Sequence, residues 1–199
     1  MVKVIIFDLA EVYLKGLLGV EHRIAELLDL DPKTVYESLH VPELTLLFKG
    51  RITEDEYWER VIAITGWNLD IQKLKKEVRA NFQEIQGTRE IIEALRRKYT
   101  VVVLSVHAKE WIEYCREQFR LSELFHHEFY SFEYGVCKPD PQAYKHVLDK
   151  LNVQPEECVF IDDHERNLIP ARQLGIKTIR FNNPDQLKEE LKKVLVSLG

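Results

Sequence analysis

Polar side chains follow three short apolar runs of this sequence, and their types fit one chemical task. Asp8 follows Val-Ile-Ile-Phe, Ser105 ends Val-Val-Val-Leu-Ser, and Asp162 and Asp163 follow Cys-Val-Phe-Ile, while Lys138 precedes Pro-Asp-Pro, where a helix is expected to begin. A carboxylate can attack phosphorus, a hydroxyl can hold a phosphoryl oxygen, and a lysine neutralises the nucleophile and the transferring group. The pattern predicts a phosphoryl-transfer site whose catalytic residues are Asp8, Ser105 and Lys138.

The carboxylates of this set imply a cation. Asp8, Asp162 and Asp163 would repel one another unless a positive ion joined them, and hard oxygen ligands around a phosphate favour Mg²⁺. We expect Mg²⁺ to be held by these three carboxylates together with the backbone carbonyl of Ala10, since a carbonyl ligand requires no side chain.

The elements that position these residues alternate between strand and helix patterns. Short β-branched or aromatic runs lie at residues 2–7, 100–104, 126–130, 157–161 and 177–181. Helical patterns lie at residues 88–98, 108–120, 140–151, 164–174 and 184–197, the last with apolar residues Leu187, Leu191, Val194, Leu195 and Leu198. This alternation predicts an α/β fold, a Rossmann-like three-layer core with a parallel sheet, in which ligands bind beyond the carboxyl ends of the strands.

About eighty residues separate the first two strand patterns, far more than one crossover needs, and they are helical throughout. Expected helices cover residues 20–29, 32–40, 53–65 and 70–85, with Asp31-Pro32 and Thr53-Glu54 as starts and Gly50 and Gly66 as breaks. The last helix is expected to bury one face formed by Ile71, Leu74, Val78, Phe82 and Ile85. We therefore predict a helical cap over residues 15–85, inserted into a catalytic core of residues 1–14 and 86–199.

Composition limits the partners and the compartment. The 199 residues carry a net charge of -5 with basic and acidic residues interleaved, which argues against a nucleic-acid partner. No apolar stretch reaches the roughly 18 residues of a membrane span, and Asp8 interrupts the first apolar run, so we expect a cytoplasmic protein without a membrane partner. Cys115, Cys137 and Cys158 are widely spaced, which favours reduced thiols over disulfides or a zinc site. Oligomeric state is not indicated.

The four motifs, their order and the helical insert resemble the haloacid dehalogenase superfamily, whose members are mostly phosphatases with a small cap. Residues 160–176 are similar to the fourth motif of the branch that includes sugar-phosphate phosphatases and the N-domain of epoxide hydrolase. The resemblance implies that Asp163 binds Mg²⁺ directly and that Asp162 supports the ion directly or through water. It also implies that Ser105 binds phosphate, that Lys138 holds Asp8, and that Asn167 supports the metal site or faces the substrate.

The first motif departs from the phosphatase pattern at Ala10. Phosphatases of this superfamily carry a second aspartate two residues after the nucleophile as general acid and base, and a methyl group can do neither job. Glu11 is adjacent, but the next side chain of an extended segment points to the opposite side. His164 follows the metal carboxylates, and His107 follows Ser105 closely. With an unperturbed pKa near ~6.5, His107 is the best candidate for the missing acid.

The favoured hypothesis is a Mg²⁺-dependent hydrolase of a small phosphorylated metabolite that acts through phospho-Asp8. Because losing a general acid typically costs on the order of 10² to 10⁴ in rate, acyl and aryl phosphates should be better substrates than sugar phosphates. The main alternative is a catalytically weak or inactive protein that binds phosphate and Mg²⁺. Ala10 favours that alternative, whereas retention of the nucleophile, lysine and metal carboxylates counts against it.

Two further alternatives come from relatives without an acid at the Ala10 position. Phosphonatases carry alanine there and use a cap lysine as a Schiff base, for which Lys49 is the candidate substrate-binding residue, although the sequence after Ala10 differs from theirs. A haloacid dehalogenase ranks last, because Asp162 and Asp163 would repel each other in a site without a metal.

Overall fold

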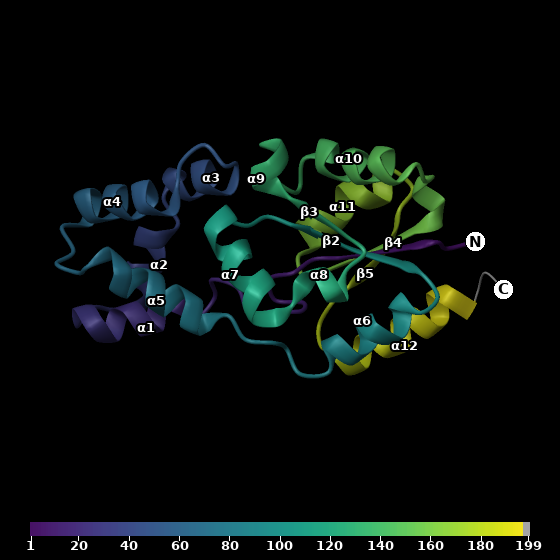
Figure 1. The fold of residues 1–199 in the computed structure, drawn as a ribbon, viewed down its shortest axis with the longest axis horizontal. Helices are drawn as coiled ribbons and strands as arrows, with labels where there is room; N and C mark the ends of the chain where they lie inside the picture. The colour runs from purple at the N-terminus through teal and green to yellow at the C-terminus, as the bar shows by residue number, and fades with distance from the viewer. Residues whose placement is uncertain (197–199) are drawn as a thin grey trace.

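The computed structural model describes residues 1–196, and a five-stranded parallel sheet forms its centre (Figure 1). The strands are β1 Val4–Phe7, β2 Thr100–Ser105, β3 His127–Tyr130, β4 Cys158–Asp162 and β5 Lys177–Arg180, in the order β3-β2-β1-β4-β5. β1 pairs with β2 on one side and β4 on the other, so the strand order reverses around it. In such sheets the crevice beyond the carboxyl ends at the reversal point binds ligands. The predicted α/β, Rossmann-like fold is confirmed.

Helices cover both faces of this sheet and bury alternating residues of its strands. The core helices are α6 Thr88–Arg96, α7 Lys109–Phe119, α10 Pro141–Leu151, α11 Glu165–Gln173 and α12 Pro184–Val196. Ile5 and Phe7 of β1 pack into the cluster that includes residues of α6, α7 and α12. Val4 and Ile6 pack into a second cluster with residues of α10 and α11. The period of two in β1 therefore produces a three-layer core.

Five further helices lie between β1 and α6 in the chain and occupy the left part of Figure 1. They are α1 Val20–Leu28, α2 Pro32–Leu39, α3 Pro42–Phe48, α4 Glu54–Thr65 and α5 Ile71–Asn81. We call these five helices the cap. Asp31 caps α2, Thr53 forms a capping box with Glu56 at α4, and Gly66 ends α4, as the sequence predicts. The exact cap boundaries, residues 15 and 85, stay a prediction.

Two expectations about the cap are wrong in detail. The helix expected over 70–85 ends at Asn81, because residues 83–85 run beside the chain after β1: the N–H of Ile85 donates to Tyr13 O, and the N–H of Lys15 donates to Gln83 O. Ile85 is therefore not on the buried face of that helix. The sequence also gave no indication of α3, a seven-residue helix that begins at Pro42.

The core holds three short elements that the sequence did not predict: α8 Leu121–Leu124, α9 Ser131–Tyr134 and a 3₁₀ turn at Pro155–Glu157. Leu198, expected on the last helix, lies outside the described residues. Among residues 1–196, no helix combines the length and apolar character needed to cross a membrane.

Candidate active site

The carboxyl ends of β1, β2 and β4 bring the predicted polar residues to one edge of the sheet. Asp8 follows β1, Ser105 ends β2 and Asp162 ends β4, and all three side chains are buried. Lys138 enters from the loop before α10, where its Nζ lies 2.8 Å from Asp8 Oδ2 and 2.6 Å from Asp162 Oδ2. The second oxygen of Asp8 accepts the N–H of Leu9 at 2.7 Å. One lysine thus joins two carboxylates that the chain supplies 154 residues apart.

Burial and mutual contact shift the pKa values of Asp8, Asp162 and Lys138. Burial raises the pKa of Asp8, and Asp162 and Asp163 raise it further, whereas Lys138 opposes the shift. For Asp162, burial also raises the pKa, but Lys138 and hydrogen bonds from His164 N–H and the Asn167 amide outweigh it and hold the pKa below its usual range. Burial lowers the pKa of Lys138, but the two carboxylates outweigh it and raise the value. Of the two carboxylates that contact Lys138, Asp8 is therefore the one whose charged form is less stabilised.

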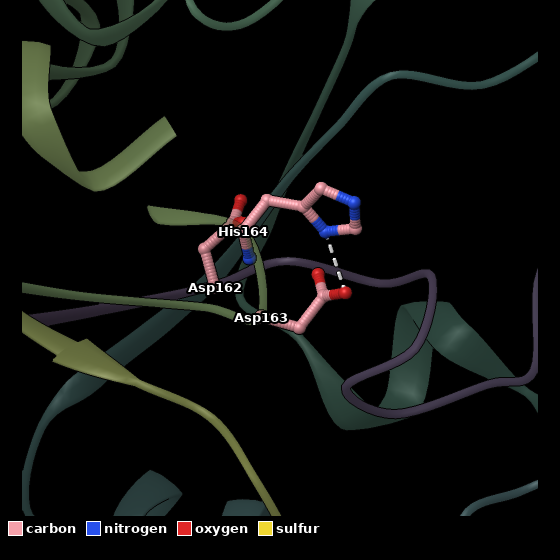
Figure 2. A group of neighbouring side chains, drawn as sticks. All are labelled: Asp162, Asp163 and His164. Atoms are coloured by element: carbon pink, nitrogen blue, oxygen red, sulfur yellow. Dashed lines mark hydrogen bonds and ion pairs between the residues drawn. The ribbon is translucent and has the colours of Figure 1, made fainter. Parts of the chain in front are cut away.

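The donor set fits a divalent cation. Asp8 and Asp162 share Lys138 in a buried setting, and Asp163 lies half-buried beside them, so that the three carboxylates, when ionised, carry two more negative charges than this lysine balances. Oxygens of Asp162 and Asp163 and a ring nitrogen of His164 all lie within 4.8 Å of one another. Figure 2 shows the Asp163 carboxylate turned toward the His164 ring, with Oδ2 2.6 Å from Nδ1. Among the described residues, no hydrogen bond reaches the Ala10 carbonyl, so its oxygen is available as a ligand.

Besides the His107 ring described below, two buried polar atoms of the predicted site residues have no hydrogen-bond partner among the described residues. Asn167 donates its amide to both oxygens of Asp162, at 3.0 and 3.1 Å, while its own Oδ1 has no hydrogen bond. The hydroxyl of Ser105 is also buried without a partner. Because unsatisfied buried polar atoms are costly, these two atoms indicate an unfilled hydrogen-bonding role beside Asp8 and Asp162.

A cavity of about 260 Å³ opens beside these residues, between the strand ends and the cap. Its core side includes Asp8, Ala10, Lys138, Asp163 and Asn167, whereas Ser105 is not among the lining residues. The rest of the wall combines apolar Leu17, Leu44, Phe48, Val106 and Trp111 with polar or charged Glu11, His40, His107, His164 and Arg166. The cavity therefore presents the charged strand-end residues to one part of a ligand and a mixed polar and apolar wall to the rest.

His107 lines this cavity, but its environment does not suit an acid. The ring is buried between Phe82 and Trp111, with ring centroids 5.5 and 5.7 Å away, and its Nδ1 has no hydrogen-bond partner. Burial lowers the pKa of His107 to about 4. The imidazole is therefore neutral at pH 7, with no proton to donate as an imidazolium, which argues against His107 as the replacement acid.

Glu11 lies at the cavity, contrary to the expectation that it points away. Its φ of 56° is in the left-handed region, so the alternation of an extended segment does not apply. Its Oε1 accepts the N–H of Gly16 at 2.7 Å, and both residues line the cavity. Burial raises the pKa of Glu11, and Asp163 raises it further, whereas the bond from Gly16 opposes the shift. A positive φ cannot be read from a single glutamate in a sequence, which is why this residue was missed.

Lys49 and the nucleophile Asp8 line different cavities. Lys49 does not line the cavity at Asp8 but a neighbouring one of about 500 Å³. His164 lines the Asp8 cavity with an exposed side chain. The roles of Lys49 and Asn167 in substrate binding stay predictions.

Fold and site together define a class of protein. Residues 2–175 match the family model of the haloacid dehalogenase-like hydrolases, and the chain belongs to that family. The resemblance drawn from the four motifs is therefore confirmed, and the protein is a hydrolase with phosphatase-like relatives.

Particular relatives have related activities. The chain is 26% identical over 167 residues to the chloroplast flavin mononucleotide hydrolase 1 of Arabidopsis thaliana, covering 84% of this chain and 68% of that protein. It is 25% identical over 158 residues to the D-ribitol-5-phosphate phosphatase of Bacteroides thetaiotaomicron, covering 76% and 77%. A match of 45% identity over 74 residues to bifunctional epoxide hydrolase 2 of Rattus norvegicus spans 37% of this chain and only 13% of that protein.

Among solved structures, the chain resembles a family enzyme of Bacteroides thetaiotaomicron that was crystallised with magnesium and inorganic phosphate. The TM-score is 0.77, the sequence identity is 21%, and the match covers 92% of this chain and 96% of the other. At that identity the likeness shows a shared fold.

Proposed function

We propose that this chain is a Mg²⁺-dependent phosphatase that acts on a small phosphorylated metabolite through an aspartyl phosphate on Asp8. The observation that carries the proposal is the buried contact of Asp8 with Lys138, 2.8 Å apart, on the floor of a cavity that the cap covers. Phosphatase relatives, and a similar fold crystallised with magnesium and phosphate, support the same reaction class.

The residues of the chain have distinct tasks in this reaction. A carboxylate oxygen of Asp8 attacks phosphorus, the bond from phosphorus to the leaving oxygen breaks, and that oxygen takes the electron pair. Lys138 neutralises Asp8 and the transferring group while Asp162 holds its ammonium in place. The unpartnered hydroxyl of Ser105 would donate to a phosphoryl oxygen. Attack by water on the phosphorus of the acyl phosphate then releases phosphate and restores the Asp8 carboxylate.

Mg²⁺ would be held by Asp8, Asp163 and the Ala10 carbonyl, with Asp162 in support, and it would supply positive charge against which the phosphoryl group is bound. Asp162 is the least free of these ligands, because its two oxygens accept four hydrogen bonds, whereas those of Asp8 accept one from Leu9 and contact Lys138. Asp163 is half-buried and lines the cavity, which makes its carboxylate the main side-chain ligand besides Asp8.

Ala10 bears on which leaving groups this site can expel, because it supplies no acid. It lines the cavity next to Asp8 and offers no proton, and His107 is neutral at pH 7. An alkoxide leaving group needs a proton as the bond breaks, whereas an acyl or aryl oxygen leaves without one. We therefore propose that acyl and aryl phosphates are hydrolysed faster than sugar phosphates.

A phosphate-release screen tests the proposal directly. Acetyl phosphate, an aryl phosphate and a sugar phosphate are incubated with the protein in the presence of Mg²⁺ or of EDTA. The expected result is Mg²⁺-dependent release in that order of rates, abolished in Asp8→Asn. Release that persists unchanged in Asp8→Asn, or no release from any of the three substrates, contradicts the proposal.

A second candidate is a module that binds phosphate and Mg²⁺ without turnover, and Ala10 is the observation that favours it. This protein would bind inorganic phosphate in the presence of Mg²⁺ in a calorimeter yet release none from any substrate. Retention of Asp8 in a buried contact with Lys138 favours the enzyme, because a binding module does not need a nucleophile.

A further inference from the structure

A second cavity adjoins the one above Asp8 and shares its wall. The two cavities have His40, Leu44, Phe48, Val106, Lys138 and Arg166 in common. The second has a volume of about 500 Å³, nearly twice that of the first, and extends between α3 of the cap and the loop that carries Lys138. A ligand whose phosphate sits at Asp8 therefore has room to continue into this space.

Two cations without partners line the second cavity. Lys49 comes from the cap and is half-buried, and Arg166 comes from the first turn of α11 in the core. Among residues 1–196, neither side chain forms an ion pair or a hydrogen bond. The single carboxylate of this wall, Asp140, already accepts the N–H of Gln142 at 2.9 Å as the cap of α10.

The position of Lys49 is fixed by contacts between cap and core. The hydroxyl of Ser131 donates to the carbonyl of Phe48 at 2.6 Å, and the Oγ of Ser131 accepts the N–H of His107 at 3.1 Å. On the other side of Lys49, Gly50 has φ 63°, and a Cβ at Gly50 would lie 2.6 Å from the carbonyl oxygen of Phe132. The backbone on both sides of Lys49 is thus held against the core, which places its side chain at this cavity rather than in open solvent.

We propose that Lys49 and Arg166 bind a second anionic group of the substrate, so that the substrate is a phosphorylated compound that also carries a carboxylate or a second phosphate. The inference rests on the proposed function, because the first phosphate must sit at Asp8. Lys49 from the cap and Arg166 from the core line the same cavity. Two such cations can bind one anion by charge-assisted hydrogen bonds, and the planar guanidinium of arginine can donate two of them in parallel. Lys138 faces both cavities, but Asp8 and Asp162 already engage its ammonium.

Binding to a protein that cannot turn over separates this proposal from the proposed function. In an Asp8→Asn background, Kd is measured by calorimetry in the presence of Mg²⁺ for the meta and para isomers of three aryl phosphates. These carry a carbamoyl group, a carboxylate or a second phosphate. We expect the carboxylate or bisphosphate probe to bind about tenfold more tightly than the neutral carbamoyl probe, a difference of about 1.4 kcal/mol. The better anionic probe identifies the second group.

Adding Lys49→Gln or Arg166→Gln to this background is expected to remove most of that difference. Lys73→Gln is the matched control, because Lys73 is an exposed cap lysine that lines neither cavity. Equal Kd values for charged and neutral probes, or a preference that survives both substitutions, overturns the inference. Failure of the proposed function has a different signature, since the wild-type protein would then release no phosphate from any probe.

Discussion

The site has two halves that differ in construction. The strand-end half contains Asp8, Lys138 and Asp162, and the cap-facing half contains Lys49. At the strand ends the charged groups are paired and buried: Lys138 joins Asp8 to Asp162, and Asn167 holds Asp162 from the other side. The cap-facing half mixes apolar residues such as Leu44 and Phe48 with Lys49, whose side chain forms no ion pair or hydrogen bond with any residue from 1 to 196. The difference separates two tasks. Paired groups on a rigid sheet suit a fixed chemical step, whereas an open wall on an inserted cap suits selection among substrates.

The largest effect of a substitution on metal binding is expected at the strand ends. Asp163→Asn removes a charged ligand and should weaken Mg²⁺ binding about 100-fold or more, whereas Asn167→Ala removes only a supporting amide and should cost about tenfold. Titration calorimetry measures both affinities. Equal and tight Mg²⁺ binding by wild type and Asp163→Asn would show that Asp163 is not a metal ligand. It would also contradict the assignment of metal binding to the strand-end half.

A buried charged contact between Glu54 and Arg79 joins two helices of the cap, and its removal tests how much it stabilises the protein. Glu54 of α4 is 1% exposed, binds Arg79 through both oxygens and accepts the indole N–H of Trp111 in the core at 2.7 Å. Glu54→Gln leaves Arg79 without its carboxylate and should lower the free energy of unfolding by about 2–3 kcal/mol.

Urea denaturation provides this measurement, and the neighbouring residue provides the control. Asp55 is exposed and pairs with the half-buried Lys75 at 2.6 Å, and because water solvates its carboxylate, Asp55→Asn should cost less than about 1 kcal/mol. Equal losses in Glu54→Gln and Asp55→Asn would mean that the buried contact stabilises the protein no more than the pair of Asp55 with Lys75.

A smaller effect, on the rate of hydrolysis, is expected at Ala10, where the strand-end and cap-facing halves meet. Ala10→Asp should raise the rate on an alkyl phosphate about tenfold more than the rate on an aryl phosphate, because only the alkoxide gains from protonation. The added carboxylate must fit beside Gly16, since a Cβ at Gly16 would lie 2.9 Å from that of Ala10. Steady-state kinetics with both substrates decides the point. Unchanged selectivity in a folded variant that still binds Mg²⁺ would show that another group already supplies the proton.

No covalent chemistry is expected at the cap lysine. Borohydride treatment with phosphonoacetaldehyde should give no adduct, because Lys49 lines the second cavity and not the one at Asp8. Mass spectrometry of the treated protein, with Lys49→Arg as the comparison, reads out the result. A reduced imine at Lys49 would instead favour a phosphonatase.

The contrast between the strand-end half and the cap-facing half also explains which features could be predicted from the sequence. Asp8, Ser105 and Asp162 end strands, and the alternation of strands and helices places such ends together without knowledge of side-chain contacts. The segments that connect core and cap, and the short helix α3, offer no such rule. The left-handed backbone of Glu11 and the strand-like pairing of residues 83–85 depend on contacts between distant segments, and the seven residues of α3 are too few for a clear helical period.

Direct detection of a phosphorylated Asp8 tests the central claim. The protein is mixed with Mg²⁺ and an aryl phosphate, quenched in acid within the first turnovers, digested with a protease at low pH and analysed by mass spectrometry. The predicted result is one phosphoryl group on the peptide that contains Asp8, absent in Asp8→Asn and absent when EDTA replaces Mg²⁺. Phosphate release by the wild-type protein with no phosphorylated Asp8 at any quench time, even under conditions that slow hydrolysis of the acyl phosphate, would contradict a mechanism through this residue.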